Sequence, residues 1–163
     1  MTEPTVDHTS SKRRRVSRFS RRGNSTLELS LVLPILMSMA FGLVEFGQFF
    51  FIKHCFESAV RDAARVATLA TATQAQVTST LTTTLAQANV TYNSSWLTIT
   101  DLGPTNSGTV TDVATVPPGD ELQFTLSTNY SGLANVVRPL YSMTGVGVKP
   151  TVSVSGVCTI IKE

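Results

Sequence analysis

Residues 29–52 read LSLVLPILMSMAFGLVEFGQFFFI, and this stretch decides how the chain is organised. Crossing a hydrocarbon core about 30 Å thick takes roughly 20 helical residues. The uninterrupted apolar run ends at Val44, Glu45 follows it, and four Phe residues lie between positions 46 and 51. A span that ended at Val44 would leave these four Phe side chains in water. We therefore predict one transmembrane helix over residues 24–52 that includes Glu45.

The residues before this span are strongly basic. Seven of the 13 Lys and Arg residues precede position 24, and only two acidic residues accompany them. Because basic segments flanking a span stay in the cytoplasm, the N-terminus is expected there and the C-terminal part outside. This predicts a cytoplasmic leader over 1–23 and an extracytoplasmic domain over 53–163. Basic charge confined to a terminal arm disfavours nucleic acid as a partner, whereas membrane lipid is an expected one.

A cleaved secretory signal is the main alternative explanation of this N-terminus. Such a signal has a short apolar core and a small-residue cleavage site soon after it. Here Glu45, the Phe residues and Lys53 follow the apolar core, and the first Ala pair, Ala63-Ala64, comes too late. The pattern therefore favours a retained membrane helix.

Two carboxylates, Glu28 and Glu45, flank or interrupt the apolar run. A carboxylate at the bilayer centre costs a few kcal/mol, so such residues usually have a partner. Either glutamate could simply be solvated, Glu28 near Arg22 and Glu45 at the outer interface. Alternatively, both are intramembrane contacts through which neighbouring subunits assemble.

The setting of Glu28 suggests a reason for proteolytic processing. A cut between Gly23 and Asn24 would make Glu28 the fifth residue of the mature chain. The new α-ammonium of Asn24 could then neutralise Glu28 of a neighbouring subunit, since a buried charge needs such a partner. Gly23 and Asn24 are thus the candidate cleavage site.

The rest of the chain predicts an α+β domain. Apolar residues recur at helical spacing to about residue 71, so the first helix is expected to continue from about residue 27 to that point. Thr73 could cap a second helix over about 74–88. Alternation then predicts strands over 97–102, 110–116, 121–128 and 148–161, with a loop or short helix over 131–146. Sequential strands after helices favour a small antiparallel sheet.

The chain has two cysteines, Cys55 just beyond the predicted span and Cys158 in the last predicted strand. Outside the cytoplasm they could form a disulfide that closes a loop of about 100 residues. Two free thiols and an intermolecular bridge remain alternatives. His54 beside Cys55 is not a credible catalytic pair, because neighbouring residues on a helix point in different directions. No other constellation of catalytic or metal-ligating residues stands out, so we expect no enzyme activity.

Several of these segments together resemble the TadE-like family of the tight-adherence (Tad) pilus system. The resemblance rests on Arg22 to Pro34 (RGNSTLELSLVLP), on Gly42 to Gly47 (GLVEFG) and on Ala63 to Ala67 (AARVA). The closing segment from Val152 to Glu163 is similar to the family's last strand more loosely. Residues 71–150 match no motif.

The resemblance implies a pilin-like fold and a minor pseudopilin or pilus-assembly component of a type IV pilus or secretion system that serves cell adhesion. It implies residence in the bacterial inner membrane, processing by a prepilin peptidase, and other pilins and the assembly platform as partners. It implies no enzyme activity and no cofactor. The alternative function is an extracytoplasmic binding module that keeps its N-terminal anchor unprocessed.

Overall fold

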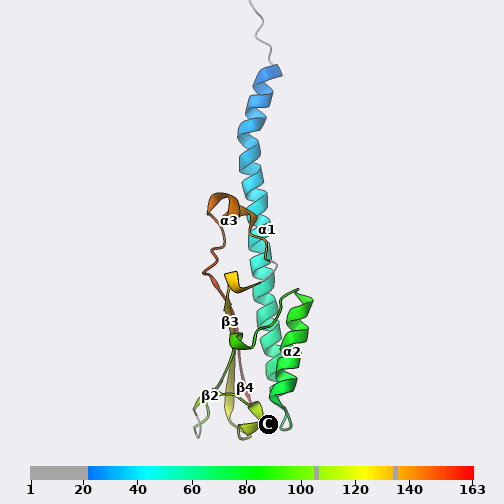
Figure 1. The fold of residues 1–163 in the computed structure, drawn as a ribbon, viewed down its shortest axis with the longest axis vertical. Helices are drawn as coiled ribbons and strands as arrows, with labels where there is room; N and C mark the ends of the chain where they lie inside the picture. Colours follow the sequence, from blue (N-terminus) through cyan, green and yellow to red (C-terminus); the bar gives the residue numbers. More distant parts are fainter. Residues whose placement is uncertain (1–21, 105–106, 134–135) are drawn as a thin grey trace, which may run out of the picture. The chain divides into compact units, whose positions relative to one another are not determined.

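The computed structural model describes residues 22–104, 107–133 and 136–163, with side chains described from Ser25 onward (Figure 1). The basic leader predicted over 1–23 lies almost wholly outside the described residues. The chain divides into two compact units, one ending at Leu36 and the other comprising Met37–Glu163.

The first helix, α1, extends from Arg22 to Ala67. Its long run of Leu, Met, Ala and Phe favours the helix, and Pro34 lies inside it. Pro34 removes one backbone hydrogen bond, which a helix in an apolar environment tolerates when neighbouring groups compensate. A single continuous helix over this range confirms the prediction from the sequence, although it ends four residues before position 71.

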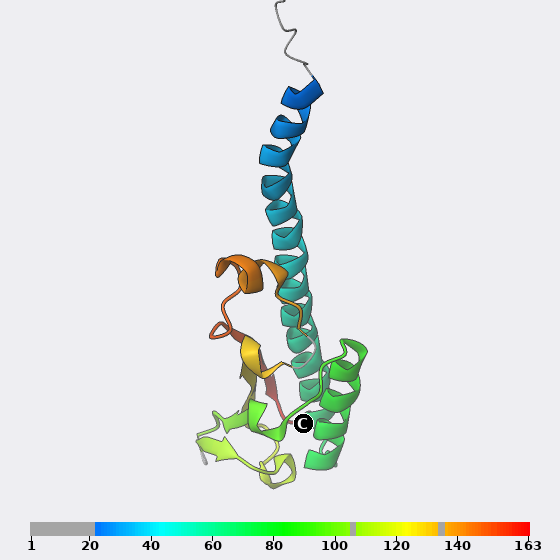
Figure 2. The same ribbon diagram turned by 45° about the horizontal axis from the view of Figure 1, so that its top comes forward.

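The second unit contains one further long helix, α2, over Gln74–Gln87. The Thr73 side chain accepts a hydrogen bond from Gln76 N, and the Gln76 side chain accepts one from Thr73 N. This capping box satisfies backbone donors that the first turn leaves unpaired. It explains why the helix begins at Gln74 in spite of its many Thr residues. In Figures 1 and 2, α2 lies beside the C-terminal half of α1.

Four antiparallel strands form one sheet with the order β2-β1-β3-β4. Short helical turns connect or flank them. The strands are β1 (Leu97–Asp101), β2 (Gly108–Val110), β3 (Glu121–Asn129) and β4 (Ser153–Ile161); the short helices are η1 (Ser94–Trp96), η2 (Val113–Thr115), η3 (Tyr130–Gly132) and α3 (Pro139–Thr144).

The core of this unit lies between α1, α2 and one face of the sheet. Residues on α1 at helical spacing are fully buried, as are the α2 stripe and alternate residues of β3: Phe56, Ala59, Val60, Ala63, Ala67, Val77, Leu81, Leu85, Leu122, Phe124 and Leu126. Burying each Leu or Phe side chain stabilises the fold by about 1.5–3 kcal/mol. The small-residue stripe of α1 therefore packs on the chain's own domain.

The last strand approaches α1 very closely. A Cβ added to Gly156 would lie 2.8 Å from the backbone oxygen of Phe56. Farther along, Glu163 N donates to Thr68 O at 3.0 Å. β4 therefore advances along α1 in the direction in which the helix itself runs.

The α+β prediction, with a second helix and a small antiparallel sheet, is confirmed. One strand prediction was wrong: residues 110–116 do not form a single strand, because β2 ends at Val110 and η2 follows. The Asp112 side chain accepts a hydrogen bond from Ala114 N and starts this turn. The final strand begins at Ser153 instead of Val148.

Candidate membrane and assembly surface

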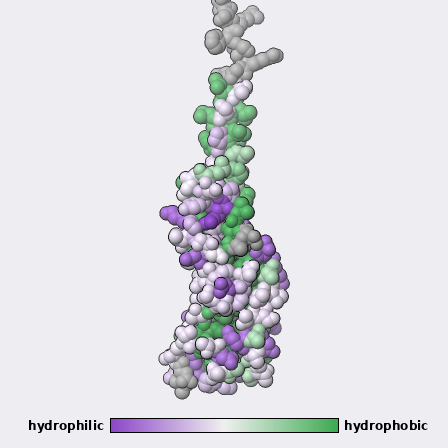
Figure 3. All heavy atoms as spheres, in the orientation of Figure 1, coloured by the Kyte–Doolittle hydropathy of each residue, from purple (hydrophilic) through white to green (hydrophobic). Residues whose placement is uncertain are grey.

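The N-terminal part of α1 exposes almost every apolar side chain that it carries. Leu31 is 74% exposed and Met39 75%, and the other large apolar residues of the helix before Glu45 are exposed as well, except Phe41, which is partly buried. The helix is long and apolar enough to cross a membrane, and its most apolar 18-residue window is 0% buried. Figure 3 shows this hydrophobic surface along the helix. Since water does not favour such a surface, α1 is a candidate membrane anchor.

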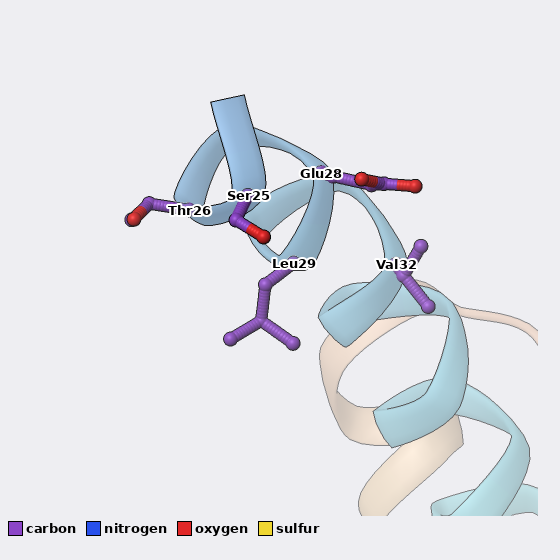
Figure 4. Close-up of a pocket in the computed structure, with 5 residues that line it drawn as sticks. All are labelled: Ser25, Thr26, Glu28, Leu29 and Val32. Carbon is purple, nitrogen blue, oxygen red and sulfur yellow. The ribbon is translucent and has the colours of Figure 1, made fainter. Parts of the chain in front are cut away.

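Glu28 lies on this exposed part of α1. It lines a shallow surface hollow with Ser25, Thr26, Leu29 and Val32 (Figure 4). Its carboxylate projects outward from the helix on the side where Val32 lies, away from Ser25, Thr26 and Leu29. The carboxylate is thus open to a partner from another molecule.

Gly23 and Asn24, the candidate cleavage site, belong to the first turn of α1. Their side-chain surroundings lie outside the described residues. Cleavage between them stays a prediction.

Glu45, in contrast, is fully buried and bonded within its own chain. One carboxylate oxygen, Oε1, accepts a hydrogen bond from Val148 N at 2.7 Å, and the other, Oε2, accepts one from Tyr141 N at 3.0 Å. Hydrogen bonds from backbone N–H groups to a carboxylate are among the stronger ones in proteins. The two bonds explain how a carboxylate is accommodated on this apolar stretch of helix.

The donors belong to residues 136–148, which contain α3 and which we call the collar segment. Gln48 Oε1 accepts a third bond, from Val137 N at 3.2 Å. A Cβ added to Gly42 would lie 3.4 Å from Leu140 Cδ2, so this side chain packs closely on α1. The collar segment therefore lies against about two turns of α1, from Gly42 to Gln48.

Gly147 is needed for this arrangement. Its φ of +138° is one that residues with a side chain rarely adopt, and an added Cβ would collide with the Glu45 carboxylate. The approach of Val148 N to Glu45 thus depends on a residue without a side chain.

Tyr130, whose pKa is affected by the charges of Glu45 and Arg138, completes this region. The Tyr130 ring packs edge-on against Phe49, with centroids 5.5 Å apart, and the Arg138 guanidinium carbon lies 5.8 Å from the centre of the Tyr141 ring. Burial raises the pKa of Tyr130 above its usual value; the Glu45 charge raises it further and the Arg138 charge opposes this. The Tyr130 hydroxyl is buried without a hydrogen-bond partner, so the neutral phenol is the form that suits this site.

Cys55 and Cys158 are partly buried and are both free thiols. Burial raises the pKa of Cys55, which keeps the thiol protonated and unreactive. His54 Nδ1 lies 3.7 Å from a Glu57 carboxylate oxygen. Two free thiols are one of the alternatives that the sequence leaves open for Cys55 and Cys158.

A buried cation at the opposite end of the domain was missed in the sequence. Lys162 is 3% exposed, and its Nζ donates to Val113 O at 2.6 Å and to Val116 O at 2.8 Å. The backbone of Lys162 also bonds Asp120 O and Gly119 N. A lysine next to the C-terminus carries no pattern that distinguishes it from a solvated one.

A second hollow, of about 340 Å³, lies between the start of α2 and the β1–β2 edge of the sheet. Hydroxyl groups line much of it, including those of Thr78, Tyr92 and Thr98. Among the residues that the structure describes, no three His, Cys, Asp or Glu side chains are grouped so as to hold a metal ion.

Fold and surface together define an α+β domain carried on one apolar helix that is a candidate membrane anchor. A family model described as TadE-like protein matches residues 23–65. This match confirms the resemblance to the TadE-like family over that segment, and it indicates a component associated with the Tad pilus. The matched range contains Gly23, Glu28, Glu45 and Cys55. No curated protein and no solved structure matches the chain.

Proposed function

We propose that this chain is a minor pseudopilin or assembly component of a Tad pilus system, in which α1 is both membrane anchor and assembly helix. The N-terminal arm is cytoplasmic, the domain from residue 53 is extracytoplasmic, and the membrane is the bacterial inner membrane. The proposal assigns the chain no catalytic role. Its partners are other pilins or pseudopilins and the assembly platform.

The observation that carries the proposal is the coincidence of the family match with the exposed helix. The matched residues 23–65 begin at the candidate cleavage site and include the whole exposed apolar stretch. Exposure of this apolar stretch to water is unfavourable, so a protein without a membrane or partner helix around it is not expected to expose it. Lateral packing against lipid and other apolar helices is the role that fits it.

The two glutamates have different roles in this proposal. Glu45 is bonded within the chain, whereas the Glu28 carboxylate projects from the open surface. Glu28 is therefore the assembly contact, paired with the Asn24 ammonium of a neighbouring subunit after cleavage by a prepilin peptidase. Glu45 binds backbone groups of its own subunit. In this proposal Glu28 alone is the intermolecular contact, although the sequence suggested both glutamates.

The test is the N-terminal sequence of the protein from cells with and without prepilin peptidase. A chain that begins at Asn24 only when the peptidase is present supports the proposal. Gly23→Val should block this cut, while Gly47→Val is the matched control, since a Cβ at Gly47 has no neighbour within 4 Å. A chain that keeps its arm in both strains contradicts processing.

The alternative function, an unprocessed extracytoplasmic binding module, is favoured by one observation. The hydroxyl-lined hollow beside α2 could hold a small polar ligand through hydrogen bonds. Under this alternative the arm is retained, and the protein does not co-purify with other pilins.

A further inference from the structure

The collar segment has an exposed apolar surface that its contacts with α1 do not explain. Val137 is 61% exposed, Met143 72% and Val146 67%. The segment binds Glu45 and Gln48 through backbone N–H groups, whereas these three side chains remain exposed, and we call them its outer side. Three such residues within ten positions make a surface that water does not favour.

The part of α1 at the same level is also apolar and exposed. Leu43 is 79% exposed, and Phe46, Phe50 and Phe51 are each about half exposed. Backbone N–H groups of the collar segment donate hydrogen bonds to the Glu45 and Gln48 side chains of α1 here. The collar segment is therefore in the same surroundings, lipid or water, as this level of the helix.

The length of the helix indicates that lipid surrounds α1 at the level of the collar segment. Counting from Leu27, the first large apolar residue of α1, a hydrocarbon core about 30 Å thick ends roughly 20 residues later, near Phe46. This is the level of Glu45, whose carboxylate the collar segment covers. Farther along, Ile52 is 3% exposed and belongs to the domain core, so lipid does not reach it.

Charge at the collar segment fits a membrane boundary as well. Arg138 lies over the Tyr141 ring, and Lys149, directly after the segment, is exposed, as is Lys53 on α1. Basic and aromatic residues are typical of the boundary between hydrocarbon and headgroups, where cations meet lipid phosphates.

We propose that the collar segment is a membrane-binding element: its outer side, formed by Val137, Met143 and Val146, inserts into the headgroup–acyl boundary of the leaflet on the C-terminal side of α1. The hydrogen bonds from its backbone N–H groups offset the free-energy cost of placing the Glu45 carboxylate at this depth. The bilayer therefore ends at the collar segment, and the helix beyond it belongs to the folded domain. The inference rests on the proposed anchoring of α1 in the membrane.

The test places an environment-sensitive fluorophore on single cysteines of the full chain in vesicles of phosphatidylethanolamine and phosphatidylglycerol. The background is Cys55→Ser with Cys158→Ala, checked by circular dichroism. Met143→Cys and Val146→Cys test the collar segment. Leu36→Cys reports on the anchor itself, and Ile161→Cys is the matched control because Ile161 is a similarly exposed apolar residue, 63%, on β4.

Quenching by lipids with a nitroxide high or low on the acyl chain measures depth. We expect labels at 143 and 146 to be quenched several times more strongly by the shallow nitroxide than the label at 161, and the label at 36 to respond to the deep one. Labels at 143 and 146 that behave like 161, while 36 is quenched, overturn the inference and leave the anchor intact. An unquenched label at 36 contradicts the anchor and the inference with it.

A second copy of the chain is the other possible occupant of this surface. In that case the emission at 143 would shift to the blue without nitroxide quenching, and the shift would disappear as the lipid-to-protein ratio is raised. That outcome also overturns binding of lipid.

Discussion

At each end of the domain, one buried ionisable side chain is hydrogen-bonded to backbone groups. At one end the Glu45 carboxylate receives two backbone N–H groups, and at the other the Lys162 ammonium donates to two backbone carbonyls. In both cases backbone groups are the hydrogen-bond partners of a buried ionisable side chain. Removing such a side chain leaves buried backbone groups unpaired, which costs about 1–3 kcal/mol each.

Lys162→Met is predicted to destabilise the protein by about 1–3 kcal/mol, because Val116 O loses its donor, whereas Val113 O keeps the hydrogen bond from Val116 N. Thermal unfolding of the full chain in detergent, followed by circular dichroism, measures this. Lys149→Met is the control, since Lys149 is exposed. Equal midpoints for the two variants would show that the buried bonds contribute nothing.

Tyr130→Phe is predicted to reduce the decrease in stability that the protein undergoes as the pH rises into the alkaline range. Burial and the Glu45 charge raise the pKa of Tyr130 above 10.0, so the folded state favours the neutral phenol. Its contribution is fully present below pH 10.0 and is lost as the pH rises past that value toward the folded-state pKa. The Phe variant removes this loss at no cost in hydrogen bonds, because the hydroxyl has no partner.

Unfolding midpoints between pH 8 and pH 11 measure the effect on Tyr130. Burial also raises the pKa of Tyr92, which is present in both proteins. Part of the decrease in the unfolding midpoint at alkaline pH is therefore expected to remain in the variant. Tyr141→Phe serves as the control. A Tyr130→Phe profile parallel to the parent profile would contradict the prediction.

Among the elements, the contact of β4 with α1 sets how closely the sheet packs on the helix. Gly156 faces the backbone of Phe56 and Glu57, where any side chain would need the strand or helix to move. The close approach allows the Ala residues of α1 to be covered completely. Helix and strand are therefore matched by small residues on both sides.

Gly156→Ala is predicted to cost about 1–3 kcal/mol, because a backbone atom cannot give way as a side chain does. Gly108→Ala is the matched strand control, since an added Cβ there meets nothing within 4 Å. It should change stability by no more than about 0.5 kcal/mol. The free energy of unfolding of both variants, from denaturant titration, checks the difference.

The same contact predicts that the two cysteines stay reduced. Gly156 lies beside Phe56. Cys158 is two strand residues farther along β4, about 7 Å nearer to the C-terminal end of α1. Cys55 lies on the other side of Phe56, and a disulfide tolerates little separation between its Cα atoms. Protein unfolded without reductant should therefore show two titratable thiols and an electrophoretic mobility that reductant does not change.

In the whole molecule, one helix serves two environments. Its first half exposes apolar side chains, and its second half contributes the small-residue stripe of a domain core. Glu28 lies in the first environment and Glu45 where the collar segment meets the helix. Their substitutions should therefore affect different properties.

Glu28→Gln is predicted to leave the unfolding midpoint of the full chain unchanged and to weaken association with other pilins. Glu45→Gln, which turns one acceptor into a donor facing a backbone N–H, should lower the midpoint. Cross-linking in membranes and thermal unfolding in detergent separate the two effects. A Glu28→Gln chain that cross-links as well as the parent would contradict the assembly role.

Much of this architecture could be predicted from the sequence because the signals are local. The apolar run and its basic flank, the α1 and α2 stripes and the Thr73 cap each lie within a few turns of chain. The strand over 110–116 was mispredicted because the Asp112 side chain favours a turn over continued pairing. The partners of Glu45 were not predictable, since they lie 96 and 103 residues away.

The sequence by itself determined that an exposed apolar helix precedes an α+β domain, because periodicity and hydropathy act over short distances. Only the tertiary structure decided where that helix passes from its exposed part into the domain. The decision depends on backbone donors of the collar segment, on Gly147 and on the burial of Ile52, which distant parts of the chain bring together. A carboxylate in an apolar run has the same appearance in the sequence whether a neighbour subunit, water or its own chain neutralises it.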